Sequence, residues 1–121
     1  YGDRETIPEA TWRSIFGKPI VFTEMGGGAK AGYHGDEGEI WTEEYQAGLY
    51  RAQIEMVKAN RTGKGGEVAG LSPWILKDFR APVRVLPGIQ DGYNRKGLIS
   101  EEGERKLAFG VLQSYYEEVA N

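Results

Sequence analysis

The sequence predicts an α/β fold in which parallel strands are joined by helical crossovers. Two apolar runs, at 19–23 and 68–76, have the length of strands and lack the polar–apolar alternation of strands with one solvent-facing side. Segments with a helical spacing of apolar residues precede, separate and follow these runs. Helices and strands therefore alternate along the chain, and strands joined through a helix are typically parallel.

The first predicted element is a helix over residues 6–16. Thr6 and Glu9 have the spacing of a capping box, and Pro8 lies in the first turn, where its missing N–H is tolerated. Gly17 is expected to end the helix, because glycine readily adopts the left-handed conformation found just after helix ends.

The first strand is predicted at 19–23, and we expect it to be buried on both faces because its apolar residues do not alternate with polar ones. Residues 26–41 should form a loop, since glycines at positions 26, 27, 28, 32, 35 and 38 oppose a stable helix. Thr42 then has the character of a helix N-cap, with Glu43 and Glu44 in the first turn.

The remaining elements follow from the same signals. The helix that begins after Thr42 is predicted to run to about Asn60, and the spacing places these residues on one face: Tyr45, Leu49, Ala52, Met56 and Ala59. The second buried strand, at 68–76, has Trp74 near its end, and residues 77–99 are predicted to form a long loop. Ser100 should cap a last helix whose apolar face holds Ala108, Val111, Leu112, Tyr115 and Val119.

Two strands are too few for a complete parallel sheet, because such sheets need both faces and their edges covered. The chain is also unusually rich in glycine, with 18 in 121 residues, and its first residue is Tyr1. We therefore expect the chain to be a piece of a larger domain. Its uncovered strand edges predict self-association of the isolated chain.

The composition excludes several classes of function. A net charge of −3 argues against a general nucleic-acid-binding protein, and no run approaches the roughly 18 apolar residues of a membrane span. No N-terminal segment resembles a signal peptide. The absence of cysteine excludes disulfides and thiolate chemistry, and a single histidine excludes a metal centre built from several imidazoles.

Glu24 is the first candidate functional residue. It directly follows a predicted buried strand and is followed after Met25 by three glycines, and the catalytic groups of parallel α/β folds lie at such strand ends. A local ion pair is the alternative role for this carboxylate. Residues 26–31 also satisfy a loose dinucleotide-binding pattern, but the further glycines oppose the helix that this pattern requires, so we reject nucleotide binding.

Trp74 and the basic loop that follows it form a second group of candidates. An aromatic ring at a strand end can stack against a sugar, and it can equally belong to the core. The loop 77–96 carries a local charge of +3, from Lys77, Arg80, Arg84, Arg95 and Lys96 against Asp78 and Asp91. This loop is either a solvated segment or a subsite for an anionic ligand, in which Asn94 and Lys96 donate to one carboxylate. The single histidine, His34, is interpreted as a residue that orders its loop.

In their order and spacing these segments resemble glycoside hydrolase family 2, and in particular its β-glucuronidases. The resemblance extends from about Ile7 to Tyr116, and no single motif within it is specific. The matching segments are 18–26, which is similar to the family's nucleophile strand, 31–34, 41–46, 73–79, 94–97 with its Asn-x-Lys motif, and the closing helix with Lys106 and 109–116.

The resemblance implies that the chain, as a single unit over 1–121, is the C-terminal part of a (β/α)8 TIM barrel and contains its last two strand–helix units. It implies a retaining glycosidase with Glu24 as nucleophile, with Trp74, Asn94 and Lys96 binding a β-glucuronide, and with no metal or organic cofactor. The acid/base glutamate of the family has no counterpart in this sequence, so the isolated chain is expected to be inactive.

Two other interpretations of the sequence stay open. A β-galactosidase of the same family is one, because the nucleophile strand is shared among enzymes that act on different sugars. The other is a catalytically inert α/β scaffold. None of these interpretations includes a nucleic acid or a membrane as a partner. A carbohydrate substrate is expected only if the chain belongs to a glycosidase.

Overall fold

A computed structural model describes residues 5–120 of the chain. The elements are, in order, the 3-10 turn η1 (Ile7–Glu9), β1 (Ile20–Phe22), α1 (Glu43–Ala59), β2 (Val68–Leu71), β3 (Phe79–Arg80), β4 (Tyr93–Asn94) and α2 (Leu107–Ala120). Neither helix has the length and apolar character that a membrane span requires within these residues.

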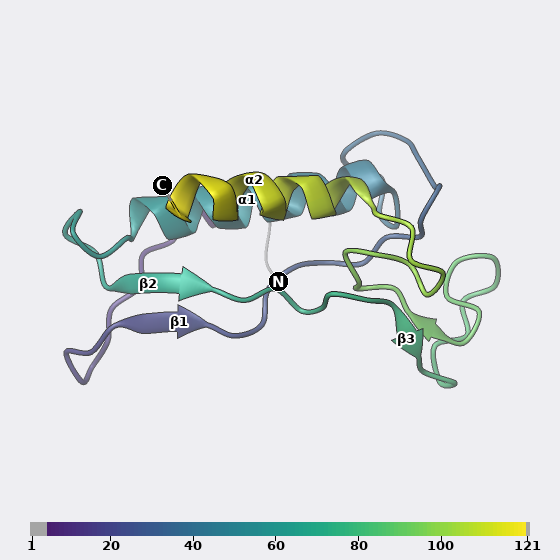
Figure 1. Ribbon diagram of the computed structural model, residues 1–121, viewed down its shortest axis with the longest axis horizontal. Coiled ribbons are helices and arrows are strands. Elements are labelled where there is room, and N and C mark those ends of the chain that lie inside the picture. Colours follow the sequence, from purple (N-terminus) through teal and green to yellow (C-terminus); the bar gives the residue numbers. More distant parts are fainter. Residues whose placement is uncertain (1–4, 121) are drawn as a thin grey trace.

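The predicted parallel arrangement is confirmed, with α1 as the crossover between β1 and β2. Ile20 pairs with Val68 and Phe22 with Leu71, and the register shifts once between Ile20 and Val21. Both helices lie on one side of this two-stranded sheet, and the antiparallel pair β3–β4 lies beyond the carboxyl ends of its strands (Figure 1). The described residues thus form a small mixed α/β unit and no closed barrel.

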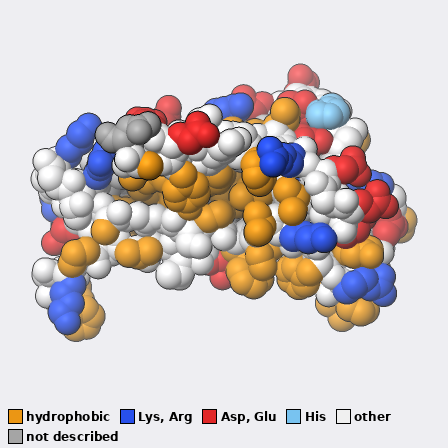
Figure 2. Space-filling model, viewed as in Figure 1, with side chains coloured by type: hydrophobic (Ala, Val, Ile, Leu, Met, Phe, Trp, Pro, Cys, Tyr) orange, Lys and Arg blue, Asp and Glu red, His pale blue; other side chains and the backbone are white. Residues whose placement is uncertain are grey.

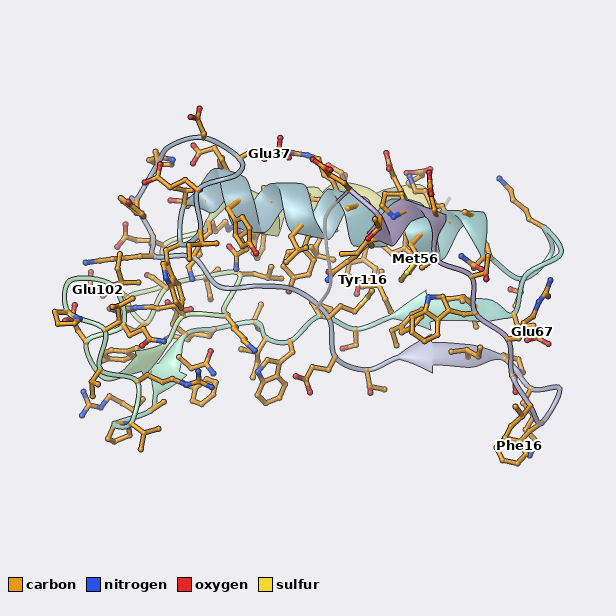
Figure 3. All side chains as sticks on the ribbon, turned by 180° about the vertical axis from the view of Figure 1, so that it is seen from behind. Phe16, Glu37, Met56, Glu67, Glu102 and Tyr116 are labelled. Carbon is orange, nitrogen blue, oxygen red and sulfur yellow. The ribbon has the colours of Figure 1, made fainter. Side chains whose placement is uncertain are left out.

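The core lies between the helices and the β1–β2 sheet. Its buried members include Leu49, Ala52, Met56 and Val57 of α1, Val68 and Leu71 of β2, and Ala108, Leu112 and Tyr115 of α2. Tyr116 and Met56 lie between the helix layer and the strand layer (Figure 3). The Tyr116 hydroxyl donates to the carbonyl of Leu71 at 2.9 Å, so a polar contact also links α2 to the sheet.

Helix α1 begins where the sequence predicts. Thr42 Oγ1 accepts a hydrogen bond from the Tyr45 amide at 3.0 Å, which satisfies one of the amides left unpaired at a helix start. The apolar face is confirmed except at Ala59, which is exposed. The first half of α1 is more buried than its periodicity predicts, because the loop before it folds back over it, and Glu37 packs where a side chain at Gly48 would lie (Figure 3).

The predicted helix over 6–16 is wrong beyond its first turn. Thr6 makes no side-chain capping bond, and the chain leaves the helical conformation at Ala10. The Asn60 side chain, just after α1, forms hydrogen bonds with the backbone of this segment instead. Its Oδ1 accepts from the Trp12 amide at 3.1 Å, and its Nδ2 donates to the Ala10 carbonyl at 2.8 Å. These tertiary hydrogen bonds use the backbone groups that a helix would have paired internally.

Strand β1 is not buried on both faces, so the expectation that both faces of the strand at 19–23 are covered is wrong. Phe22 packs against the core and meets Trp12 edge-on, with ring centroids 4.9 Å apart. Val21, one residue earlier, points to the opposite face and is 56% exposed. The apolar pattern of a doubly covered strand is therefore present, while the described residues cover only one of its faces.

Strand β2 is shorter than predicted and ends at Leu71, since Pro73 cannot donate to a ladder. The predicted loop 77–99 is wrong in one respect, because it contains β3 and β4, which pair Phe79 with Asn94 and Arg80 with Tyr93. Strands of two residues are too short to leave a periodic signal in the sequence.

Ser100 does not cap the last helix, because α2 begins at Leu107. Ser100 Oγ instead accepts from the amides of Glu102 and Glu104, at 3.2 and 3.1 Å, and so orders a turn before the helix. The buried face of α2 is confirmed at its centre, whereas Val119 is 44% exposed.

Replacing Thr42 with alanine should destabilise the chain by about 1 kcal/mol, because the first turn of α1 loses its capping acceptor. Urea unfolding followed by circular dichroism would measure the difference. Thr42→Ser keeps the hydroxyl and is the matched control. An alanine variant as stable as the serine variant would contradict the assigned cap.

Candidate functional site

Three of the candidate segments lie side by side at the carboxyl ends of β1 and β2. The Trp74 amide donates to the carbonyl of Met25 at 2.8 Å, next to Glu24. The amide of Ile75 donates to the Lys96 carbonyl at 3.1 Å, and the Ile75 carbonyl accepts from Leu98 at 2.9 Å. The segments carrying Glu24, Trp74 and Lys96 therefore follow one another as neighbours across one edge of the molecule.

The segment of Glu24 is held from beneath by α1. The Glu24 side chain is exposed, and the next carbonyl, of Met25, accepts from the Tyr50 hydroxyl at 3.1 Å. Gly26 has a φ of 125°, and a Cβ there would lie 2.1 Å from the Tyr50 hydroxyl oxygen. Only glycine fits at this position, which explains why glycine follows the carboxylate so closely.

The glycine-rich segment does not open a helix, in agreement with the rejection of a dinucleotide site. Ala29 instead forms an isolated bridge with Trp41. A Cβ on Gly27 would lie 2.7 Å from a Leu49 methyl carbon, and one on Gly28 would lie 2.9 Å from the Trp41 ring. The glycines therefore admit protein side chains to the backbone, where the nucleotide pattern would have admitted a pyrophosphate.

Trp74 is a partly exposed residue and not a core residue. Trp74 is 36% exposed, and its ring meets that of Phe79 edge-on, with ring centroids 6.1 Å apart. The peptide bond between Trp74 and Ile75 is cis. The Phe79 ring supports one side of the indole, while enough of the ring is accessible for a ligand to stack on it.

Asn94 and Lys96 lie in one tight turn. The buried Asn94 side chain accepts from the Lys96 amide through Oδ1 at 3.0 Å, the local bond typical of an Asx turn. Both residues line a small cleft of about 40 Å³ together with Arg84 and Gln90. Lys96 also borders a larger cleft of about 260 Å³, whose other walls include Trp41 and Tyr45.

Arg95 does not contribute to an open basic surface, which corrects the interpretation of its loop. It is only 6% exposed and forms ion pairs with Glu101 and, at 3.3 Å, with Asp78. Its guanidinium also lies over the Tyr93 ring, 4.9 Å from the centroid. The positive charge of the loop toward solvent therefore comes from its other basic residues.

A buried ion pair between Asp78 and Lys106 is the feature that sequence reasoning missed. Lys106 Nζ lies 2.8 Å from Asp78 Oδ1, and neither side chain is accessible to solvent. Burial raises the pKa of Asp78 and lowers the pKa of Lys106, and the hydrogen bond between them opposes both shifts. No local pattern distinguishes these two charges from surface charges, so no sequence signal marks them.

Polar side chains on one face of α1 hold the surrounding loops. Gln46 Nε2 donates to the carbonyls of Gly27 and Gly97, at 2.9 and 3.0 Å. Glu43 accepts from the amides of Gly32 and Leu107, both at 2.7 Å. Together with Tyr50 these residues recur every three or four positions, so α1 anchors the segments on both sides of the site.

His34 orders the glycine-rich loop against the start of α1, as the sequence suggested. Its Nδ1 lies 2.7 Å from a Glu44 carboxylate oxygen, and its Nε2 lies 3.5 Å from Glu43. The hydrogen bond to Glu44 raises the pKa of His34 above its ordinary value of 6.5, against a smaller opposing effect of burial. Among residues 5–120 no group of three or more His, Asp and Glu side chains could hold a metal ion.

Comparisons with known proteins bear on this site. No protein-family model matches the chain. β-Glucuronidase of Chlorocebus aethiops is 32% identical over 113 residues, which are 91% of this chain and 16% of that protein. The crystal structure of a glycoside hydrolase family 2 β-galacturonidase from Eisenbergiella tayi, bound to galacturonate, is 31% identical with a TM-score of 0.70, over 84% of this chain and 17% of that one.

A third relative, the β-D-glucuronidase structure from Dictyoglomus thermophilum, has a TM-score of 0.76 over 96% of this chain and 20% of that chain. Its 23% identity shows a shared fold only. The chain is thus similar over most of its length to glycoside hydrolase family 2 β-glucuronidases, which confirms the resemblance seen in the motifs. It spans about one sixth of the length of the curated relatives that it matches.

The His34 contact predicts a measurable titration. Because the protonated imidazole is favoured in the folded chain, its stabilising effect is complete below pH 6.5 and is lost as the pH rises through the raised pKa. NMR of the imidazole protons between pH 5 and 9 should give a pKa above 6.5, and Glu44→Gln should lower it. An unchanged His34 pKa in that variant would refute the role of Glu44.

Proposed function

We propose that this chain is the C-terminal part of a glycoside hydrolase family 2 (β/α)8 barrel, in a retaining enzyme that hydrolyses β-glucuronides. The observation that carries the proposal is the alignment of the Glu24, Trp74 and Lys96 segments through hydrogen bonds at one edge. That edge holds a carboxylate, an aromatic ring and a cation, three of the groups that suit a uronide-cleaving site, which also needs a second carboxylic acid.

The partial barrel is supported by what the chain leaves uncovered. Each strand followed by a helix is the repeating unit of such a barrel, and β1 with α1 and β2 with α2 have this order. Val21 of β1 is exposed on the face that a barrel interior would fill. The chain, taken as one unit over 1–121, also spans about one sixth of its curated relatives. The open edges of the sheet favour self-association when the chain is separated from its complement.

In this proposal Glu24 acts as the nucleophile. Its carboxylate attacks the anomeric carbon, the bond to the leaving oxygen breaks, and a second carboxylic acid protonates that oxygen. Water then cleaves the glycosyl ester of Glu24, with the second carboxylate as base. That second group comes from outside this chain, and no step needs a metal or an organic cofactor.

The carbohydrate substrate is proposed to be bound by Trp74, Asn94 and Lys96. The exposed part of the Trp74 ring suits stacking against a pyranose. Lys96 supplies a cation and Asn94 a neutral amide beside one cleft, which suits the carboxylate that distinguishes a uronic acid from a neutral sugar. The similar β-galacturonidase structure contains bound galacturonate, which supports a uronide over the neutral substrate of a β-galactosidase.

A 2-fluoro β-glucuronide should trap the longer protein as a covalent ester of Glu24, because the fluorine slows hydrolysis of the intermediate. Tryptic digestion and mass spectrometry would locate the adduct. The 121-residue chain alone is the negative control, since it lacks the second carboxylate and should release no aglycone. An adduct on a peptide without Glu24 would refute this assignment. Turnover by the chain alone that Glu24→Gln abolishes would instead refute the expected inactivity of the isolated chain.

Replacing Lys96 with alanine should lower kcat/KM on an aryl β-glucuronide by roughly 10- to 100-fold, because a charge-assisted hydrogen bond contributes ~1.5–3 kcal/mol. The residual activity on the matching glucoside should barely change. Lys58→Ala, which removes an exposed lysine on the far end of α1, is the control for the loss of a positive charge. An equal loss on both substrates would mean that Lys96 supports the loop without reading the carboxylate.

A further inference from the structure

The residues directly before and after Lys96 in the chain both form hydrogen bonds with the carboxylate of Asp78. Oδ1 accepts from the amide of Gly97 at 2.8 Å, and Oδ2 accepts from Arg95 Nη1 at 3.3 Å. The amide of Asp78 in turn donates to the Ile99 carbonyl at 3.0 Å. One buried side chain therefore sets the position of the segment on either side of Lys96.

This carboxylate is itself fixed in place. Lys106 Nζ donates to Asp78 Oδ1 at 2.8 Å, to the Ala29 carbonyl at 2.6 Å and to the Arg95 carbonyl at 3.2 Å. A Cβ on Gly97 would lie 2.2 Å from the Asp78 amide nitrogen and 2.5 Å from Oδ1. Asp78 thus occupies the space of a side chain at position 97, and the segment approaches it as closely as the backbone allows.

We propose that Asp78 is a positioning residue for sugar recognition, which holds Lys96 in place to meet the substrate carboxylate. The inference rests on the proposed function, because it assigns to Asp78 the geometry of a residue that reads the uronate. Asp78 does not itself reach the substrate, since its side chain is fully buried. It acts through the backbone, and displacements of about 1 Å in such a site can lower the rate 100-fold.

Asp78→Asn is the sharpest test. The amide keeps the size of the carboxylate, but it replaces one acceptor oxygen with a donor that faces Arg95 or Lys106 and Gly97. In the longer protein this change should lower kcat/KM on an aryl β-glucuronide by roughly 10-fold or more, mainly through KM, and should affect the matching glucoside much less.

Glu43→Gln is the matched control. Glu43 is also a buried carboxylate that accepts two backbone amides near the start of α2, but these belong to Gly32 and Leu107 and not to the Lys96 segment. It should lower the melting temperature and affect both substrates alike. The same equal loss in Asp78→Asn would overturn the inference and leave Asp78 with a purely structural role.

A double-mutant cycle separates this inference from the proposed function. If Asp78 acts through Lys96, Asp78→Asn should cost little further glucuronide activity once Lys96 is alanine. If Lys96→Ala loses its selectivity for the glucuronide but the effects of Asp78→Asn and Lys96→Ala add, only the role of Asp78 is overturned. No effect of Lys96→Ala would instead overturn the proposed function itself.

If Asp78→Asn does not fold, Asp78→Glu decides the question, because the longer side chain keeps the charge and shifts both oxygens. A selective loss on the glucuronide is then expected. Retention of wild-type selectivity in Asp78→Glu would refute the positioning role.

Discussion

The carboxylate of Asp78 is the point on which the site depends. A buried charge is costly unless it is paired and hydrogen-bonded, and this one accepts from a lysine, an arginine and a backbone amide. Removing one member of such a group leaves an uncompensated charge, at a typical cost of about 3–5 kcal/mol. The carboxylate binds Lys106, just before α2, and the turn of Lys96, and Lys106 in turn donates to the carbonyls of Ala29 and Arg95.

Helix α1 supplies the second support, and it does so with polar side chains on a buried face. Gln46 reaches the backbone of Gly27 within the glycine-rich segment, Tyr50 reaches that of Met25 just before it, and Glu43 reaches the first residue of α2. Close approach explains the glycine at position 26, which lies against Tyr50 of α1, and the glycine at position 97, which lies against Asp78. The candidate site thus owes its geometry to backbone groups pinned from below, while the side chains of Glu24 and Trp74 stay accessible.

The same architecture leaves a large apolar surface uncovered. Hydrophobic side chains form a band across the face that carries α2, seen from the front in Figure 2. A cleft of about 450 Å³ on the inner side of α2 is lined by residues that include Leu76, Leu98, Phe109 and Tyr116. An exposed apolar area of this kind is typical of a surface that packs against further structure. It fits the proposal that the chain is one part of a larger barrel.

The sequence by itself determined the features that depend on neighbours in the chain. The Thr42 cap, the length of α1 and the place of Glu24 at a strand end all arise from local patterns, and the parallel direction of the strands follows from the helix between them. The order of motifs was also sufficient to identify the resemblance to glycoside hydrolase family 2.

Only the tertiary structure decided the features whose partners are distant in sequence. Asn60 drew the segment after η1 out of a helix across 48 to 50 positions, and the Lys106 ammonium met the Ala29 carbonyl across 77. Arg95 and Asp78 lie in a segment whose composition is typical of a solvated loop. They are nevertheless buried, because each forms ion pairs with opposite charges inside the protein. Burial of a charge depends on which groups the fold brings within hydrogen-bonding distance, and no local pattern contains that information.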